Sequence, residues 1–325
     1  MLRRVSLLLF AGCALAPAEG SRTEAVVYGT DDRAPLDPAV YPEIAQTLAA
    51  LVPADRLSIE GDRVTLAATT LAERLGGPLC DGERFATELS LSDCSAVLVA
   101  PDAVLTAAHC VPNDAACEAL RVVFGYRRDA GTLTPVDPDQ VFQCVAREAE
   151  RLALDQVRLR LGRDTGRTPL PLGRARAGDA ITIAGHPAGA PALVEELTVD
   201  RREGDGFVLY ADVEDGSSGS PVIRDGTLVG ILAAGETDYE WTGDCFASRR
   251  LSDGEGEGAW ASDVTHNGGC QAAGTPPPIT LPLALLLLAM RAAPRQSRRR
   301  GASAGCARRR DRREPRRQSS ERCRA

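Results

Sequence analysis

The chain has 325 residues, enough for about two domains. Hydrophobic residues make up 44%, which excludes wholesale disorder, and 4% aromatics with 31 Gly and 21 Pro favour a turn-rich chain over a helical bundle. Residues 291–325 hold 14 of the 38 basic residues, all Arg, and 3 of the 45 acidic ones, so the rest carries 24 Arg against 42 acids. Because phosphate contacts need clustered positive charge, we expect no nucleic-acid partner.

The first 20 residues have the features of an export signal. A short basic start is followed by an apolar run at 5–10. Phe10-Ala-Gly-Cys13 resembles a bacterial lipobox, in which Cys13 would be lipidated, whereas Ala16-Pro-Ala18 offers an ordinary signal-peptidase site. Both alternatives predict an exported bacterial protein in a compartment that permits disulfides.

Short apolar runs separated by Gly, Pro and Asp predict β structure in most of the body that follows. Before them, Asp37-Pro38 and apolar residues at helical spacing (Val40, Ile44, Leu48, Leu51) predict a helix. The runs 96–99 and 103–106 flank Pro101-Asp102 and predict a hairpin. Further strands are expected at 121–124, 141–145, 157–161, 181–184, 207–210, 222–223 and 228–233. This series fits a β sandwich or barrels and not a doubly wound α/β sheet.

The segment 271–325 contains a Pro spacer, an apolar run at 279–290 and the Arg-rich end. The apolar run is shorter than the roughly 20 residues of a spanning helix. Cys270, the apolar stretch and the Arg cluster together resemble the MYXO-CTERM sorting tails of surface proteins in some Gram-negative bacteria. An ordinary membrane anchor with a positive cytoplasmic flank is the alternative. We expect membrane association through one of the two termini, and a location at the cell surface or outside the cell.

The first motif with chemical content is Leu105-Thr-Ala-Ala-His109-Cys110, directly after the hairpin. Cys94 and Cys110 lie at the two ends of the hairpin, so a disulfide between them would clamp the loop that carries His109. A metal site would need ligands at suitable spacing, and none is nearby. We therefore expect a catalytic imidazole and neither metal nor cofactor. His186 lies in a turn between Gly185 and Pro187 and is expected to be structural.

The second motif is Asp155, which enters an alternating strand. A buried carboxylate there would accept a hydrogen bond from an imidazole N–H, fix its tautomer and stabilise the imidazolium ion. A solvated turn Asp is the alternative, in which case Asp164 or Asp179 would take the role.

The third motif is Asp215-Gly-Ser-Ser-Gly-Ser-Pro221, in which Ser218 is the predicted nucleophile. Gly216 lets the backbone turn so that its N–H and that of Ser218 point at one spot and form an oxyanion hole. The three motifs follow the chain order His, Asp, Ser, which is that of chymotrypsin.

These motifs resemble trypsin-like (chymotrypsin-fold) serine proteases, closest to the bacterial glutamyl-endopeptidase-like branch. TAAHC with a Cys sixteen residues upstream, SSGSP, and the sequence VVYGTDDR at 26–33 carry the resemblance. It implies an all-β fold of two six-stranded antiparallel barrels with the active site in the cleft between them. The protease domain would cover 21–270, with the first barrel at about 80–165 and the second at about 170–265. His109 and Asp155 would come from the first barrel and Ser218 from the second, and the substrates would be proteins or peptides.

Two departures concern activation and the catalytic acid. In trypsin-type zymogens a new N-terminus pairs with an Asp just before the nucleophile, but Ser217 stands here, so we expect no activation by that pair. Ala233 stands where a Ser usually supports the catalytic Asp. It lies on the strand 229–235, which resembles the substrate-pairing strand, and it is predicted to contact substrate together with Asp212 and Gly235.

The determinants of cleavage preference are open. Gly235 keeps the position that pairs with the substrate backbone, and Asp212, six residues before Ser218, matches the acid that selects Arg or Lys in trypsin-type enzymes. Leu232 replaces the His that glutamyl endopeptidases are expected to use for a substrate carboxylate, so a preference for Glu is not supported.

Six cysteines remain when Cys13, the tail pair and Cys270 are set aside. With Cys94 and Cys110 paired, three connectivities stay open for Cys80, Cys117, Cys144 and Cys245. The sequence thus predicts a secreted or surface-anchored serine endopeptidase that works through an acyl-enzyme. A catalytically silent barrel pair that acts as a surface binding module is the alternative, and the oligomeric state is open.

Overall fold

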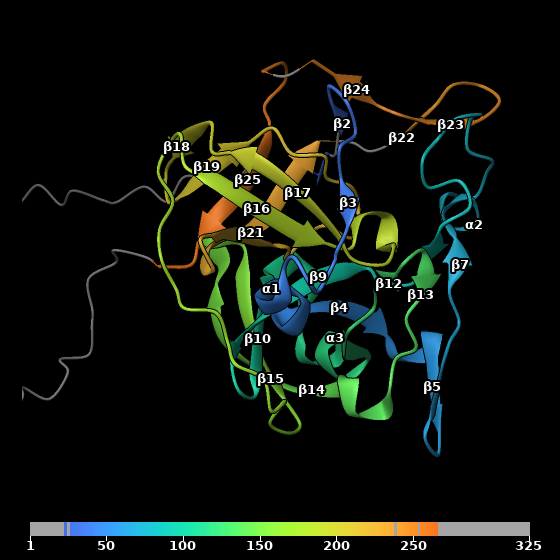
Figure 1. Cartoon of the computed structure of the whole chain (residues 1–325), viewed down its shortest axis with the longest axis vertical. Helices are drawn as coiled ribbons and strands as arrows, with labels where there is room; N and C mark the ends of the chain where they lie inside the picture. Colours follow the sequence, from blue (N-terminus) through green and yellow to red (C-terminus); the bar gives the residue numbers. More distant parts are fainter. Residues whose placement is uncertain (1–22, 25–26, 237–238, 253, 266–325) are drawn as a thin grey trace, which may run out of the picture. The chain divides into compact units, whose positions relative to one another are not determined.

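Strands dominate the part of the chain that the structure describes (Figure 1). The structure is a computed structural model, and it describes residues 23–24, 27–236, 239–252 and 254–265. No helix among these residues is both long and apolar enough to cross a membrane. The predicted export signal with Cys13 and the predicted sorting or anchoring tail lie outside the described residues.

A closed barrel of six strands forms the first half of the body, in the order β10-β15-β14-β11-β4-β9. The strands are β4 (Leu48–Pro53), β9 (Cys94–Ala100), β10 (Ala103–Ala107), β11 (Leu120–Phe124), β14 (Val141–Arg151) and β15 (Gln156–Leu161). Large apolar side chains such as Leu98, Phe124 and Leu159 are fully buried in the core of this barrel. The predicted hairpin is confirmed, because β9 and β10 pair antiparallel around Pro101-Asp102.

This barrel begins earlier than the sequence predicts, at Leu48 instead of near residue 80. The predicted helix exists only as α1 (Pro42–Thr47), since Leu48 and Leu51 lie in β4 between β9 and β11. Val40, expected on the apolar helix face, is 63% exposed. The run Leu48-Ala-Ala-Leu-Val is buried throughout, and periodicity alone cannot separate such a strand from a buried helix.

A second sheet has the order β18-β19-β25-β21-β20-β16-β17-β3, with β1 joined to β21. Its strands are β1 (Thr23–Glu24), β3 (Ala34–Pro35), β16 (Ala180–Gly185), β17 (Leu193–Thr198), β18 (Arg201–Glu203), β19 (Gly206–Leu209), β20 (Pro221–Arg224), β21 (Thr227–Glu236) and β25 (Ala259–Asp263). Most of these strands lie in the range predicted for the second barrel, and they enclose a core around Phe207, Val222 and Val229.

Short hairpins and helices fill the connections. The remaining strands are β2 (Val27–Tyr28) with β24 (Arg250–Leu251), β5 (Leu57–Glu60) with β6 (Arg63–Leu66), β7 (Thr69–Thr70) with β8 (Leu89–Ser90), β12 (Arg128–Asp129) with β13 (Thr132–Leu133), and β22 (Tyr239–Trp241) with β23 (Phe246–Ser248). The other helices are α2 (Leu71–Leu75), α3 (Asp114–Glu118), η1 (Ala54–Arg56), η2 (Ala108–Cys110), η3 (Pro138–Gln140), η4 (Leu152–Leu154) and η5 (Pro187–Gly189). Of these, η2 contains His109, and η4 directly precedes Asp155.

Three disulfides cross-link the described residues. Cys94–Cys110 forms as predicted, and Cys117–Cys144 and Cys80–Cys245 select one of the three connectivities that the sequence left open. Cys117–Cys144 joins α3 to β14 in the first barrel. Cys80–Cys245 links positions 165 residues apart.

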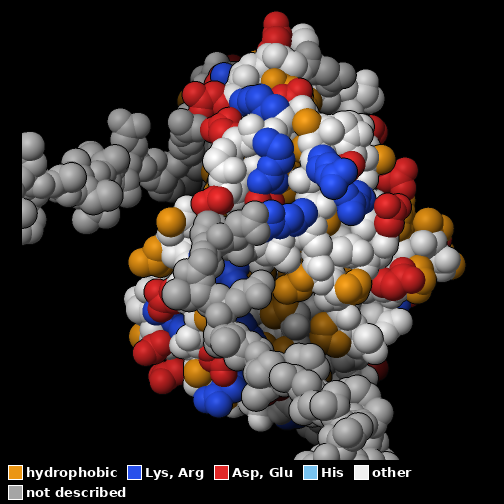
Figure 2. Space-filling model, turned by 90° about the vertical axis from the view of Figure 1, so that its left-hand side faces the viewer, with side chains coloured by type: hydrophobic (Ala, Val, Ile, Leu, Met, Phe, Trp, Pro, Cys, Tyr) orange, Lys and Arg blue, Asp and Glu red, His pale blue; other side chains and the backbone are white. Residues whose placement is uncertain are grey.

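Arginine and acidic side chains are interspersed on the face drawn in Figure 2. Many arginines of the second sheet form ion pairs, as in Arg201–Asp200 at 2.8 Å and Arg224–Asp179 at 2.6 Å. Arg202 of β18 binds both carboxylate oxygens of Asp263. These pairs place positive and negative charge side by side.

Candidate active site

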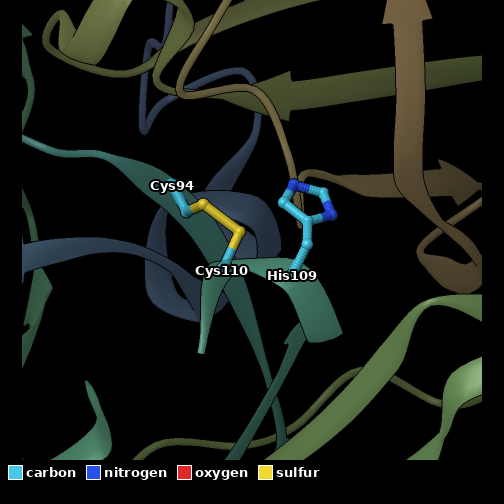
Figure 3. Close-up of side chains that lie close together, drawn as sticks. All are labelled: Cys94, His109 and Cys110. Atoms are coloured by element: carbon cyan, nitrogen blue, oxygen red, sulfur yellow. A yellow bond between two sulfur atoms is a disulfide. The ribbon is translucent and has the colours of Figure 1, made fainter. Parts of the chain in front are cut away.

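His109 lies on η2, the single turn that follows β10. The turn is fixed on both sides, because the Cys94–Cys110 disulfide ties it to β9 and the N–H of Ala108 donates to the carbonyl of Asp155 at 2.8 Å. Figure 3 shows the imidazole pointing away from this disulfide. The disulfide uses both sulfurs, so neither cysteine can offer a thiolate ligand to a metal beside His109.

Asp155 follows η4 and has a left-handed backbone, with φ 48° and ψ 47°. Aspartate tolerates this conformation better than most residues. The bend aims its carboxylate at His109: Oδ1 accepts the backbone N–H of His109 at 2.9 Å, and Oδ2 lies 2.5 Å from its Nδ1. A carboxylate can only accept here, so it favours the tautomer with a proton on Nδ1 and leaves Nε2 free to accept.

Ser218 lies in the loop between β19 and β20, and its Oγ is 2.9 Å from Nε2 of His109. The carbonyl of Ser218 accepts the N–H of Ser95 at 2.8 Å, a bond that reaches from β9 of the first barrel to this loop. The structure therefore brings together the three residues that the sequence predicted as nucleophile, base and orienting acid.

The loop around Ser218 contains two glycines with positive φ, Gly216 and Gly219. Gly216 has φ +98°, and a Cβ there would lie 2.5 Å from the carbonyl oxygen of His186, so only glycine fits. Gly219 donates its N–H to the carbonyl of Leu232 at 2.8 Å. Within the described part of the chain, the N–H groups of Gly216 and Ser218 donate to no protein group. These are the two donors predicted for the oxyanion hole.

Ser95 is a supporting residue that the sequence reasoning missed. Its hydroxyl is fully buried, donates to the carbonyl of Gly216 at 2.9 Å and accepts the N–H of His186 at 3.0 Å. It thus fixes the peptide that follows Gly216 against the first barrel. The available signal was a serine directly after Cys94 at the start of a buried strand.

His186 has the structural role that the sequence predicts. The ring is buried, and its Nδ1 lies 3.0 Å from the carbonyl oxygen of Ala190. Burial lowers the pKa of His186 to about 4, so the ring is neutral at physiological pH. Its carbonyl forms one wall of the space beside Gly216.

The sequence model of the trypsin-like peptidase domain matches residues 94–231, a range that contains His109, Asp155 and Ser218. This part of the chain therefore matches a trypsin-like peptidase domain. The match confirms the predicted all-β fold class with two antiparallel barrels. The first barrel is observed as a closed barrel, and the second sheet corresponds to the predicted second barrel.

Solved structures similar to this chain include a protease and a binding protein. A Glu endopeptidase in complex with MPD is 16% identical, with 74% of this chain and 94% of that chain covered and a TM-score of 0.45. Human heparin binding protein is 16% identical, with 72% and 91% covered and a TM-score of 0.42. No curated protein sequence matches the chain significantly.

The residues predicted on the substrate-pairing strand, Ala233 and Gly235, lie near the end of β21. Ala233 offers no hydroxyl, and among the described residues the carboxylate of Asp155 accepts hydrogen bonds only from His109. Gly235 pairs in parallel with Thr23 of β1, so this edge of β21 already accepts an added strand from the same chain. Pairing of Gly235 with a substrate backbone stays a prediction.

Asp212, the third residue predicted to contact substrate, is buried among other acids. Its Oδ1 accepts the N–H of Tyr28 at 2.7 Å, and its own N–H donates to Oε2 of Glu195 at 2.9 Å. Carboxylate oxygens of Asp212, Glu195 and Asp32 lie within 4.8 Å of one another. The N-terminal segment thus covers Asp212, and its contact with a substrate stays a prediction.

This acid cluster predicts a stability that falls as the pH rises. Burial, with the charges of Asp212 and Asp32, raises the pKa of Glu195 to about 8 from an ordinary 4.5, although Arg33 opposes the rise. A raised folded-state pKa stabilises the protein fully below 4.5, and this contribution is lost as the pH rises to about 8. The loss in the free energy of unfolding is about 5 kcal/mol at most.

We expect Glu195→Gln to flatten the fall in stability between pH 5 and 8, because an amide oxygen still accepts the N–H of Asp212 but does not titrate. Denaturant unfolding at several pH values measures this. Glu60→Gln, in the exposed β5–β6 hairpin, is the matched control and should keep the wild-type slope. Parallel curves for wild type and Glu195→Gln would contradict the prediction.

Proposed function

We propose that this protein is an exported serine endopeptidase that hydrolyses peptide bonds through Ser218, His109 and Asp155. The observation that carries the proposal is the relay of two short contacts, 2.9 Å from Ser218 Oγ to His109 Nε2 and 2.5 Å from His109 Nδ1 to Asp155. Acyl transfer by an activated serine needs a nucleophile, a base and an orienting acid in this arrangement. The match to the trypsin-like peptidase domain supports the same reaction class.

The proposed reaction has two halves. In the first, Nε2 of His109 takes the proton of Ser218 while the serine oxygen forms a bond to the substrate carbonyl carbon. The oxyanion that results accepts hydrogen bonds from the N–H groups of Gly216 and Ser218. His109 then gives the proton to the amine, the C–N bond breaks and an ester to Ser218 remains. Water repeats the sequence on the ester, releases the acid and restores the serine.

The predicted cellular location is outside the cytoplasm. Three disulfides among the described residues fit an oxidising compartment. With the predicted export signal and the predicted tail, this supports a protein that is secreted or held at a bacterial cell surface. The predicted substrates are proteins or peptides, and the proposed chemistry uses no metal or cofactor.

The test is labelling of the full chain with a fluorophosphonate, read by intact mass. The reagent bonds only to a serine that a working base and oxyanion hole activate, so we expect one adduct on the wild type and none on Ser218→Ala. Ser252→Ala, in the loop between β24 and β25, should label like the wild type. A folded, fully disulfide-bonded wild type that takes no label would refute the proposal and favour a silent binding module.

A further inference from the structure

The N-terminal segment runs against the second sheet and places one arginine in the interior. β2 pairs with β24, and β3 pairs with Leu193 and Val194 of β17. Arg33 lies just before β3, and only 4% of its surface is exposed. A charged side chain buried to this degree needs partners, and its partners show what the segment does.

Arg33 makes a fixed set of contacts. Its Nε and Nη2 bind the carboxylate of Asp31 at 2.9 and 2.7 Å, and the same Nη2 donates to Oε1 of Glu214 at 3.1 Å. The guanidinium carbon lies 4.7 Å from the ring centre of Phe85. Arg84 binds both Asp31 and the carbonyl of Arg33. The guanidinium is therefore held by its own segment and reaches one residue of a distant loop.

That residue, Glu214, is built into the loop that carries the predicted oxyanion hole. Its carbonyl accepts the N–H of Ser217 at 2.8 Å, and its own N–H donates to the hydroxyl of Ser217 at 3.2 Å. This double link closes a turn around Gly216. Tyr239 also donates to the carboxylate of Glu214 at 3.2 Å. The backbone of Glu214 thus closes the turn, while its side chain makes the contacts with Arg33 and Tyr239.

The contact between Arg33 and Glu214 is electrostatic. Burial raises the pKa of the Glu214 carboxyl, and the positive charge of Arg33 opposes that rise. Without the guanidinium, a carboxyl only 5% exposed would take up a proton or turn toward water. Either change would release the turn that shapes Gly216 and Ser217.

We propose that Arg33 is a positioning residue for the oxyanion hole and that its pair with Glu214 holds the Glu214–Ser217 turn in the competent form. This inference rests on the proposed function. It explains how a loop with Ser217 in place of an acid is kept in shape. The positive charge that reaches this loop is the buried guanidinium of Arg33.

The test compares the steady-state kinetics of the full-chain variants Arg33→Met and Arg33→Lys with the wild type. Loss of oxyanion stabilisation acts on the transition state, so we expect kcat to fall about 100-fold in Arg33→Met with little change in KM. Arg33→Lys keeps the charge and should recover part of kcat. Arg202→Met is the matched control, because it removes an ion pair with Asp263 in β25 and should keep kcat.

Two readouts separate positioning from general damage. The low-field proton resonance of the His109–Asp155 hydrogen bond should persist in Arg33→Met, because that pair lies in the first barrel. Should Arg33→Met fail to fold, Glu214→Gln keeps a similar shape and removes the charge, and we expect a fall in kcat of about tenfold.

The outcomes distinguish this inference from the proposed function. If the wild type does not react with fluorophosphonate, both the proposed function and the role of Arg33 are refuted. Two results would overturn the role of Arg33 and leave the proposed function standing. One is a reactive wild type with the same kcat as Arg33→Met, and the other is a loss of kcat in Arg33→Met equal to that in Arg202→Met. A kcat loss confined to Arg33→Met and Glu214→Gln, with the low-field resonance retained, supports it.

Discussion

Replacing Asp155 with Asn should lower kcat about 10⁴-fold while the protein stays folded. The carboxylate of Asp155 accepts from both the backbone N–H and the Nδ1 of His109. An amide has one accepting oxygen and one donating nitrogen, so the side chain of the Asp155→Asn variant can satisfy only one of these donors. Its NH₂ group would favour the tautomer that carries the proton on Nε2, and that nitrogen could then not take the proton of Ser218.

The matched control is Asp164→Asn. Asp164 caps a turn by accepting the N–H of Gly166 at 2.7 Å, and an amide oxygen accepts that bond equally well. Steady-state kinetics on a peptide substrate, with circular dichroism to verify folding, measure both variants. An equal loss in the two variants, or wild-type kcat in Asp155→Asn, would mean that another acid orients His109.

Gly219→Ala is the substitution that we expect to cost the most stability at the site. Gly219 has φ +84°, and a Cβ there would lie 2.1 Å from the carbonyl oxygen of Ser95 and 2.3 Å from the hydroxyl of Thr106. Both atoms belong to the first barrel, and the carbonyl is backbone that cannot rotate away. We expect the free energy of unfolding to fall by about 4 kcal/mol or more, with loss of activity.

Gly226→Ala separates the two causes of that loss. Gly226 has φ +70°, and nothing lies within 4 Å of its added Cβ, so this variant carries the backbone strain without the clash. We expect a cost of about 1 to 2 kcal/mol. Denaturant unfolding of both variants gives the comparison. If both variants lose the same free energy of unfolding, the loop at Gly219 approaches Ser95 less closely than the structure shows.

The three side chains of the proposed catalytic relay could be predicted from the sequence because each motif is local. His109, Asp155 and Ser218 stand in short stretches whose residue types are distinctive by themselves, and the structure brings the three side chains together. Most strands were predictable for the same reason, because the spacing of apolar residues and the turn residues that separate strands are visible within a few positions of the sequence. The run from Leu48 was not, because a buried strand and a buried helix share its pattern.

The contacts that support the site could not be predicted from the sequence, because they join segments far apart in the chain. Arg33 and Glu214 are 181 positions apart, and nothing beside either residue indicates that both are buried. The hydroxyl of Ser95 reaches Gly216 across 121 positions. Such pairs depend on how segments far apart in the chain pack together, which the local pattern of a single sequence does not express.

The Cys80–Cys245 disulfide affects how long a protease survives cleavage by other copies of itself. Any single backbone cut between residues 81 and 244 leaves two fragments that this bond still joins. Turns such as Gly131 in the β12–β13 hairpin and Gly204 between β18 and β19 fall inside that range and are surface sites where nicking concentrates. A molecule nicked there by a neighbour keeps both fragments in one particle, and the damage becomes visible only after reduction.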